Sequence, residues 1–226
     1  ANLSEIEAAF GAKAREQAFE RLLLSVRQSI GQERIEAHRS LGIIEVTMRL
    51  SRMPRHKRTA MLAEQIRALA LATPLNSDKG PFFVIPAITA IAFLPGRSER
   101  DIARLKAYDY ADRQRPLAHA RTEAASYRAD MKSAAELLGQ LANGRAAFAH
   151  QAIAATGQGL PPLYHESLLR IGDDDGAFAA CEMAILAVER LDLSFAMDAR
   201  LAAIAVDRLE HDATLRLGVN ISARSS

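Results

Sequence analysis

Apolar residues near the amino terminus recur at the spacing of a helix. Within a helix-forming stretch from about residue 3 to residue 35, successive apolar positions are three or four residues apart: Phe19, Leu22, Leu23, Val26 and Ile30. Such spacing places them on one face, so the sequence predicts one long amphipathic helix. That face either packs into the core of its own domain or contacts a second chain in a parallel dimer. The pattern is too short to specify a coiled coil.

Strands and helices then alternate as far as Asn143. The segment 40–50 is rich in β-branched residues and partly alternates in polarity, which predicts a strand. The other expected elements are a helix at 58–72, a loop at 76–80, one or two strands within 81–94, and helices at 98–113 and 116–142. The last helix carries an apolar stripe of Tyr127, Met131, Ala135, Leu138 and Leu141. Asn143-Gly144 ends it, because both residues tolerate a left-handed cap.

After Asn143 the periodicity changes to short strands with helices between them. We expect strands at 147–154 and 163–171, a turn at 157–162, helices at 177–190 and 194–210, and a strand at 214–221. The first two strands are expected to be antiparallel or adjacent. A strand that follows another after intervening helices has crossed over, so the last strand is expected to be parallel to its neighbour. The sequence therefore predicts two domains, 1–142 and 143–226.

Composition and charge exclude several classes of protein. Of the 226 residues 49% are apolar, and 29 Lys and Arg stand against 27 Asp and Glu, an excess of 2 that gives no strong field for a nucleic acid polymer or an anionic membrane. The basic run Arg49, Arg52, Arg55, His56, Lys57 and Arg58 lacks interleaved aromatic residues, so we interpret it as a solvated loop rather than a phosphate site. Residues 82–94 are too short to span a bilayer and are broken by Pro86. The chain is expected to be cytoplasmic, although a longer parent protein could be membrane-attached.

Two further features are expected to have no chemical role. Cys181 is the single cysteine and lies on an apolar helix face without a nearby histidine to activate it, which predicts a packed thiol. The acidic loop 173–176 lacks the spaced ligands of a calcium loop, so we interpret it as a solvated connection.

Candidate chemistry gathers on the expected strands after Asn143. Residues two apart in a strand share a face, so Glu166, Leu168 and Arg170 project together, with the carboxylate and the guanidinium about 13 Å apart. Gln151 lies on the preceding strand, and Asn220 lies at the end of the strand that follows two helices. The alternative is a plain ion pair between Glu166 or Arg170 and a neighbouring strand. By the same parity, His150 and His165 should point away from Gln151 and Glu166.

These residues stand in a recognisable order over about 80 residues. The stretches Phe148-Ala-His-Gln151-Ala-Ile, Glu166-Ser-Leu-Leu-Arg170, Glu189-Arg-Leu-Asp192 and Val219-Asn220-Ile-Ser222, together with Asp198, resemble the opening of an EAL domain. That family hydrolyses the bacterial messenger cyclic di-GMP on a (β/α)8 TIM barrel. Two departures are visible: alanine follows Gln151 where the family usually has proline, and Ser167 replaces the alanine of Glu-Ala-Leu. Neither departure removes a ligand.

The resemblance implies a role for each of the four residues. Glu166 and Asn220 would be metal ligands for Mg²⁺ or Mn²⁺, while Gln151 and Arg170 would bind cyclic di-GMP. Family barrels continue for on the order of 100 residues beyond the point reached at Ser226, so the later acidic ligands and lysine are not expected in this chain. No complete catalytic set is therefore predicted, and the question of enzymatic activity stays open at this point.

The region before Asn143 resembles a GGDEF domain only loosely. Residues 87–113, a strand followed by a helix, are similar to the last part of that cyclase fold, and Tyr127-Arg-Ala-Asp-Met131 is similar to the helical linker that joins GGDEF and EAL domains. The Gly-Gly-Asp-Glu-Phe turn is missing. The expected fold is thus α/β, a partial EAL-like barrel preceded by a helix-rich α+β module.

Three functions fit these observations. The first is a cyclic di-GMP signalling protein that binds its ligand, or regulates, rather than hydrolysing it. The second is a non-enzymatic module that forms a homodimer or binds a partner protein, because three strands of a barrel leave open edges. The third is a general α/β regulator in which the motif match is accidental.

Overall fold

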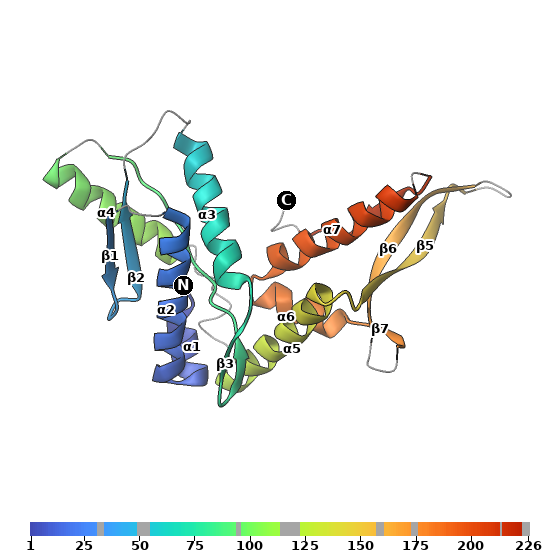
Figure 1. Cartoon of the computed structure of the whole chain (residues 1–226), viewed down its shortest axis with the longest axis horizontal. Helices are drawn as coiled ribbons and strands as arrows, with labels where there is room; N and C mark the ends of the chain where they lie inside the picture. Colours follow the sequence, from blue (N-terminus) through green and yellow to red (C-terminus); the bar gives the residue numbers. More distant parts are fainter. Residues whose placement is uncertain are drawn as a thin grey trace. The chain divides into compact units, whose positions relative to one another are not determined.

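The protein is described by a computed structural model that covers residues 1–30, 34–48, 55–93, 96–113, 123–156, 161–172, 176–212 and 214–222. It is a mixed α/β chain with two compact units, Ala1–Ala129 and Asp130–Ser226 (Figure 1). The division falls inside helix α5 (Ala124–Ala142), whereas the sequence places the domain boundary at the end of that helix. No helix in the described part of the chain is both long and apolar enough to cross a membrane.

The prediction of one long first helix is wrong, because the structure has two helices in this stretch. α1 (Leu3–Phe10) ends at Gly11, and α2 (Ala12–Ile30) packs against it. Gly11 has φ 97° and ψ 171°, a conformation that is essentially restricted to glycine, and its N–H donates to the carbonyl of Glu7 at 2.9 Å. The predicted stripe of α2 does pack inside its own unit: Phe19, Leu22, Leu23 and Val26 are all buried.

The strands of the first unit form two separate hairpins. β1 (Arg34–His38) and β2 (Ile43–Thr47) are antiparallel, with Glu36 opposite Glu45. β3 (Leu75–Ser77) and β4 (Gly80–Phe82) form the second pair. The sequence assigned residues up to 35 to a helix and so missed β1. It also placed strands throughout 81–94, but residues 83–93 carry no strand pairing among the described residues.

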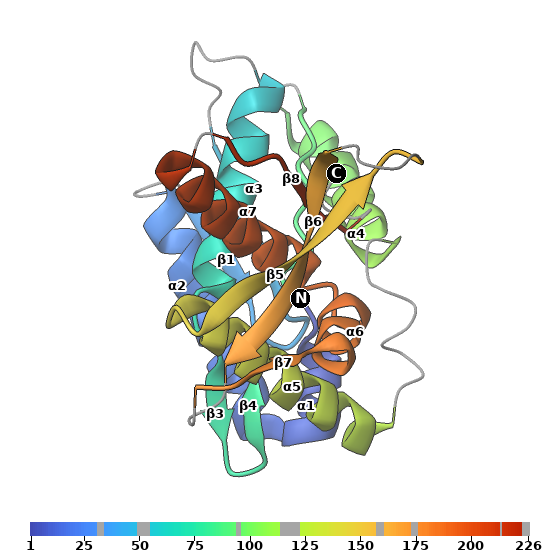
Figure 2. The ribbon, with the colours of Figure 1, turned by 90° about the vertical axis from the view of Figure 1, so that its right-hand side faces the viewer.

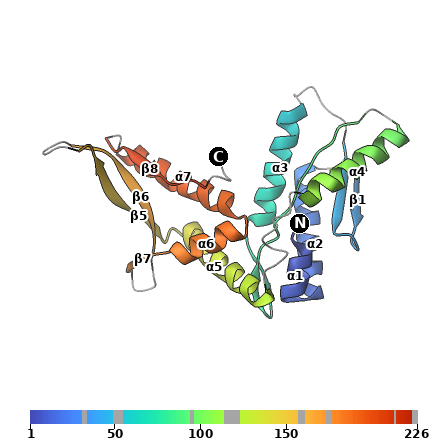
Figure 3. The same cartoon turned by 180° about the vertical axis from the view of Figure 1, so that it is seen from behind.

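Two helices complete this unit, α3 (Arg55–Leu71) and α4 (Arg97–Arg113), both close to their predicted bounds. α3 packs against α2, and α4 lies beside the β1–β2 hairpin (Figure 3). Part of the basic run, Arg49 and Arg52 with the side chains of Arg55 and His56, lies outside the described residues.

A buried asparagine joins separate parts of the first unit. Asn2 is 6% exposed, and its Nδ2 donates to the carbonyl of Phe83 at 3.0 Å and to the hydroxyl of Tyr127 at 2.8 Å. Its Oδ1 accepts the N–H of Ile85 at 2.8 Å. All polar atoms of this side chain are therefore used, as burial requires. The ring of Phe10 packs against two aromatic rings of the same unit, with centroids 5.1 Å from Phe82 and 6.4 Å from Tyr127.

The second unit is built on one sheet centred on a long strand. β6 (Pro162–Gly172) pairs along its length with β5 (Ala146–Ala154). The pair is antiparallel, one of the two arrangements that the sequence left open. The other edge of β6 carries antiparallel β7 (Phe178–Ala180) near one end and parallel β8 (Leu217–Val219) further along (Figure 2). The predicted parallel pair is thus confirmed. Four strands in this arrangement do not amount to a barrel, so the partial (β/α)8 barrel stays a prediction.

Helices α5, α6 (Glu182–Arg190) and α7 (Ser194–His211) accompany this sheet. Arg190 of α6 donates to both carboxylate oxygens of Asp130 in α5, at 2.8 and 2.5 Å. The predicted stripe of α5 is nearly right: Tyr127, Met131, Leu138 and Leu141 are buried, with Ala134 in place of Ala135. The prediction that a helix starts at 177 is wrong, because residues 178–180 form β7. Parts of the predicted turn at 157–162 and of the acidic loop, residues 157–160 and 173–175, lie outside the described residues.

Candidate functional site

Two of the predicted site residues face each other across the antiparallel strands of the second unit. Gln151 of β5 lies directly opposite Glu166 of β6 in the strand register. Directly opposed residues project from the same face of a sheet, with Cβ atoms about 5 Å apart. Gln151 is exposed and Glu166 is half-buried, so an amide and a carboxylate stand next to each other at an accessible surface.

The parallel pair adds the third residue. Glu166 is paired with Gly218 of β8, and Asn220 follows two residues later. The Asn220 Nδ2 donates to Glu166 Oε1 at 3.0 Å, although the two residues are 54 apart in the sequence. Asn220 Oδ1 and Glu166 Oε2 have no hydrogen-bond partner in the part of the chain that the structure describes. Both oxygens are therefore free to accept a hydrogen bond or to contact a cation.

A buried carboxylate fixes the segment that carries Asn220. Asp198 of α7 is 5% exposed, and its Oδ2 accepts the N–H of Ser222 at 2.9 Å. α7 also packs beside β8. The sequence placed Asp198 within the motif match but gave it no role. The partner of Asp198, Ser222, follows a strand that the sequence predicts at 214–221 and that the structure places at Leu217–Val219. Bounds of this precision do not identify which backbone N–H a distant carboxylate accepts.

Arg170 lies on the same face of β6, four residues beyond Glu166. It is half-buried, and its Nη1 donates to the carbonyl of Leu169 at 2.9 Å. Within the described ranges, no acidic side chain forms an ion pair with Arg170 and no basic side chain forms one with Glu166, so the plain ion pair that the sequence left open is not seen there. The guanidinium keeps donors for an added anion.

Cys181, just after β7, lies near this arginine. Its Sγ is 4.0 Å from the same Leu169 carbonyl oxygen. Burial raises the pKa of the Cys181 thiol, and the positive charge of Arg170 opposes that rise only in part. The thiol is half-buried and mainly protonated at neutral pH, which agrees with the predicted packed role.

The opposite face of the sheet is the packed one. Ser167 and Leu169 of β6 are 4% and 8% exposed, and the rings of His150 and His165 approach each other there with centroids 6.4 Å apart. Strand parity thus predicted correctly that both histidines point away from Gln151 and Glu166. The candidate site occupies the other, accessible face.

The residues on this face do not make a metal site by themselves. Glu166 and Asn220 offer one free oxygen each, whereas Mg²⁺ or Mn²⁺ takes about six oxygen ligands. Within the described ranges, a group of three or more acidic, His or Cys side chains close enough to share an ion occurs only at Glu36, His38 and Glu45, in the first unit. The predicted metal role of Glu166 and Asn220 stays a prediction.

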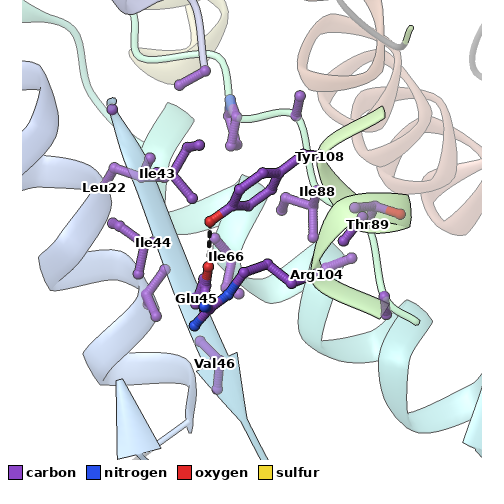
Figure 4. A pocket seen from close by; sticks show the side chains of 18 of the residues that line it. Leu22, Ile43, Ile44, Glu45, Val46, Ile66, Ile88, Thr89, Arg104 and Tyr108 are labelled. Atoms are coloured by element: carbon purple, nitrogen blue, oxygen red, sulfur yellow. Dashed lines mark hydrogen bonds and ion pairs between the residues drawn. The ribbon is translucent and has the colours of Figure 1, made fainter. Parts of the chain in front are cut away.

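The group of Glu36, His38 and Glu45 was not found from the sequence, because residues 34–38 were not expected to form a strand. Their ligand atoms lie within 4.8 Å of one another. Both carboxylates, however, are held by α4: Arg100 donates to Glu36 at 2.8 Å, and Arg104 donates to Glu45 at 2.7 Å. The hydroxyl of Tyr108 also donates to Glu45 (Figure 4).

The electrostatics of this group are those of a structural ion-pair network. Burial alone would raise the pKa of Glu45, but the hydrogen bonds from Tyr108 and Arg104 outweigh it and lower the pKa below its ordinary value. Burial and the Glu45 carboxylate together raise the pKa of Tyr108 to about 12. A cation would have to displace two arginines, so the network fastens α4 to the hairpin and is not a metal site.

Comparisons with known proteins give structural neighbours only. No protein-family model matches the chain, and no curated protein matches it. Two solved structures of the S helix–GGDEF–EAL part of Vibrio cholerae LapD are similar to it. The apo structure has 14% identity and a TM-score of 0.38, covering 98% of this chain and 52% of its own. The structure bound to c-di-GMP has 15% identity and a TM-score of 0.39, covering 99% and 53%. The chain spans about half the length of these structures, and similarity at this level assigns it no family.

Proposed function

We propose that the second unit binds cyclic di-GMP on the accessible face of β5, β6 and β8, and that it acts as a ligand-binding module of a signalling protein. The proposal starts from the EAL-like order of motifs between residues 148 and 222. The observation that carries it furthest is the contact of Asn220 with Glu166, directly beside Gln151. Residues that the motif groups together by order alone also lie together in space.

The chemistry of the face suits an anionic dinucleotide. Arg170 has a guanidinium whose one hydrogen bond among the described residues goes to the Leu169 carbonyl, so its remaining donors can form charge-assisted hydrogen bonds to a phosphate. Gln151 is exposed and offers both an amide donor and a carbonyl acceptor to a base edge. A cyclic dinucleotide is large enough to span the about 13 Å from residue 166 to residue 170.

The same residues favour binding over hydrolysis. Metal-assisted phosphodiester cleavage needs a cation held by several oxygen ligands, and Glu166 with Asn220 offers two. We therefore propose binding that does not depend on Mg²⁺ or Mn²⁺. The residues described here provide no complete catalytic set for cleaving the diester.

Calorimetric titration of the whole chain with cyclic di-GMP tests this function. Arg170→Ala should weaken binding roughly 10- to 100-fold, because one hydrogen bond to a charged group contributes about 1.5–3 kcal/mol. Arg208→Ala is the matched control, since it removes the same charge from an exposed position on α7 and should leave the affinity unchanged. EDTA should also have little effect.

Three outcomes would contradict the proposal. Absence of a binding heat at millimolar cyclic di-GMP, or equal affinities of wild type and Arg170→Ala, would exclude a ligand site on this face. Release of linear dinucleotide in the presence of Mg²⁺ would show instead that the chain is a phosphodiesterase.

A non-enzymatic interaction module is the second candidate, favoured by one observation. The outer edge of β5 has no partner strand among the described residues, and an exposed strand edge is a template for pairing with another chain. Light scattering tests this candidate: a homodimer at micromolar concentration would support it, and a strictly monomeric chain would count against a homodimer.

A further inference from the structure

The first unit contains a large cavity that is separate from the proposed ligand face. Its volume is about 1990 Å³. It is bounded by β2, by residues 86–93, by α2 and α3, and by α4 (Figure 4). Most of the lining is aliphatic, with Leu22, Ile66 and Ile88 as examples. A well-folded domain rarely leaves so much apolar surface without a packing partner.

The cavity runs along the edge of β2, not over one of its faces. Every residue from Ile43 to Met48 lines it. Side chains alternate between the two faces of a strand, so an uninterrupted run of lining residues means that the cavity meets the strand edge-on. The other edge of β2 is paired with β1, and the edge toward the cavity has no partner strand in the described part of the chain. Unpaired backbone N–H and C=O groups therefore border the cavity.

Residues 86–93 form the opposite border of the cavity and also lack a strand partner among the described residues. Residues 86–93 also line the cavity without interruption, and neither turn nor bend breaks this stretch. Its sequence, Pro-Ala-Ile-Thr-Ala-Ile-Ala-Phe, is uncharged, and its isoleucines, threonine and phenylalanine are residue types that strands favour. Yet from Ala87 to Phe93 the described residues provide no backbone hydrogen-bond partner. Two strand-like edges thus face one cavity, and neither is paired there.

The charged side chains described around the cavity already have partners of opposite charge. Arg104 pairs with Glu45, Arg100 with Glu36, and Arg15 with Glu7. Among the residues that the structure describes, these pairs include the charged side chains that line the cavity. In that part of the wall an occupant finds apolar side chains, backbone hydrogen-bonding groups and charges that are already paired, which suits an uncharged segment.

We propose that this cavity is the acceptor site for one extended, uncharged β-strand of about six residues, supplied by another polypeptide. The strand pairs with β2 on one side and with residues 86–93 on the other, and so joins them into one sheet. α2 and α3 cover one face of the added strand with apolar side chains, while α4 covers the other. This inference does not depend on the cyclic di-GMP proposal, because the two sites lie in different units.

The test uses the whole chain and a synthetic peptide with a Val-Thr-Val-Thr-Val-Thr core and two lysines at each end for solubility. Saturable binding is expected by fluorescence anisotropy of the labelled peptide. In hydrogen exchange, the peptide should protect backbone amides both in 43–48 and in 87–93, since an inserted strand bonds to both edges. The same peptide with a central proline should not bind, because proline is excluded from the middle of a sheet.

A pair of variants on α3 provides the control in the protein. Ala63 lines the cavity, whereas Ala60 is exposed and does not. Ala63→Arg places a charge in the path of the strand and should weaken peptide binding roughly tenfold or more. Ala60→Arg adds the same side chain three residues away and should bind the peptide as wild type does.

Three results would overturn the inference. One is a lack of peptide binding. Another is binding that protects neither 43–48 nor 87–93, which would place the peptide elsewhere. The third is strong protection of both segments in the protein without peptide, which would mean that this chain, or a second copy of it detected by light scattering, already fills the cavity.

Discussion

Arg170 lies close enough to Cys181 for its positive charge to affect the reactivity of the thiol. Both contact the carbonyl oxygen of Leu169, through Nη1 at 2.9 Å and through Sγ at 4.0 Å. Burial raises the pKa of the thiol, and the guanidinium lowers it in part. Because the chain has a single cysteine, any thiol reaction reports this position alone.

We expect the folded chain to react more slowly with Ellman's reagent at pH 8 than the chain in urea, by a factor of about ten for each unit of pKa increase. Arg170→Ala should slow the reaction further, because the charge that favours the thiolate is lost. Arg208→Ala should not change it. A thiol that reacts faster when folded would show that Cys181 is activated, against the packed role.

The reaction rate of the Cys181 thiol should also change when the proposed ligand binds at Arg170. Phosphate bound to Arg170 would offset its positive charge near Cys181 and cover the half-buried sulfur. Cyclic di-GMP at a concentration that just saturates wild type should therefore slow the reaction in wild type and have much less effect on Arg170→Ala, which binds more weakly. An unchanged rate in wild type, despite binding by calorimetry, would place the ligand away from Arg170.

For single residues, the sequence predicts the strand face from which a side chain projects better than it predicts the residue to which that side chain is hydrogen-bonded. Strand parity was sufficient to put Glu166 and Arg170 on one face and His150 and His165 on the other. It could not show that the Asn220 amide donates to Glu166, or that Asp198 holds Ser222, because a bond between residues 54 or 24 apart depends on strand register. Register is set by the packing of the whole sheet.

The break between α1 and α2 depends on one glycine. Gly11 has φ 97°, and a Cβ there would meet no atom within 4 Å, so the cost of a side chain is conformational rather than steric with neighbours. Gly11→Ala should destabilise the first unit by about 1–3 kcal/mol. Urea unfolding followed by circular dichroism measures this change.

Gly139 in α5 is the control, because it is helical and a Cβ there also has open space. Gly139→Ala should stabilise the chain by up to about 1 kcal/mol, as alanine favours the helix. If both substitutions had the same sign, the break at Gly11 would not depend on its backbone conformation.

The attachment of α4 to the β1–β2 hairpin should depend on pH at both ends of the scale. The pKa of Glu45 is lowered from its ordinary value of 4.5, so its contribution is present above that value and is lost as pH falls through the lowered pKa. The pKa of Tyr108 is raised from 10.0 to about 12, so its contribution is present below pH 10 and is lost as pH rises toward 12.

Two variants separate these contributions. Glu45→Gln should flatten the loss of stability below pH 4.5 relative to wild type, and Tyr108→Phe should flatten the loss above pH 10. Urea midpoints across the pH range provide the measurement. Wild-type slopes in both variants would mean that the hydrogen bond between Tyr108 and Glu45 is absent in solution.

At the scale of the whole molecule, the two proposed sites lie in two separate compact units. Hydrogen exchange on the intact protein should therefore separate the two ligands. Cyclic di-GMP should protect amides in β5, β6 and β8 and leave 43–48 unchanged, whereas the strand peptide should do the reverse. Protection of both regions by either ligand would mean that binding couples the units, which neither proposal requires.

The sequence by itself determined most of the alternation of helices and strands, the buried face of α2 and the two faces of β6. These follow from periods of 3.6 and 2, which are local properties. The order of elements also predicted that the last strand runs parallel to its neighbour, and the resemblance to the EAL family, rather than periodicity, pointed to the four residues of the candidate site. The tertiary structure decided what depends on partners distant in the chain. It decided that residues 34–38 pair as a strand, that 83–93 lack a ladder despite their β-branched sequence, and that Asn220 meets Glu166. Hydrogen bonds between strands need a second segment at the right place, and no local pattern encodes where that segment lies.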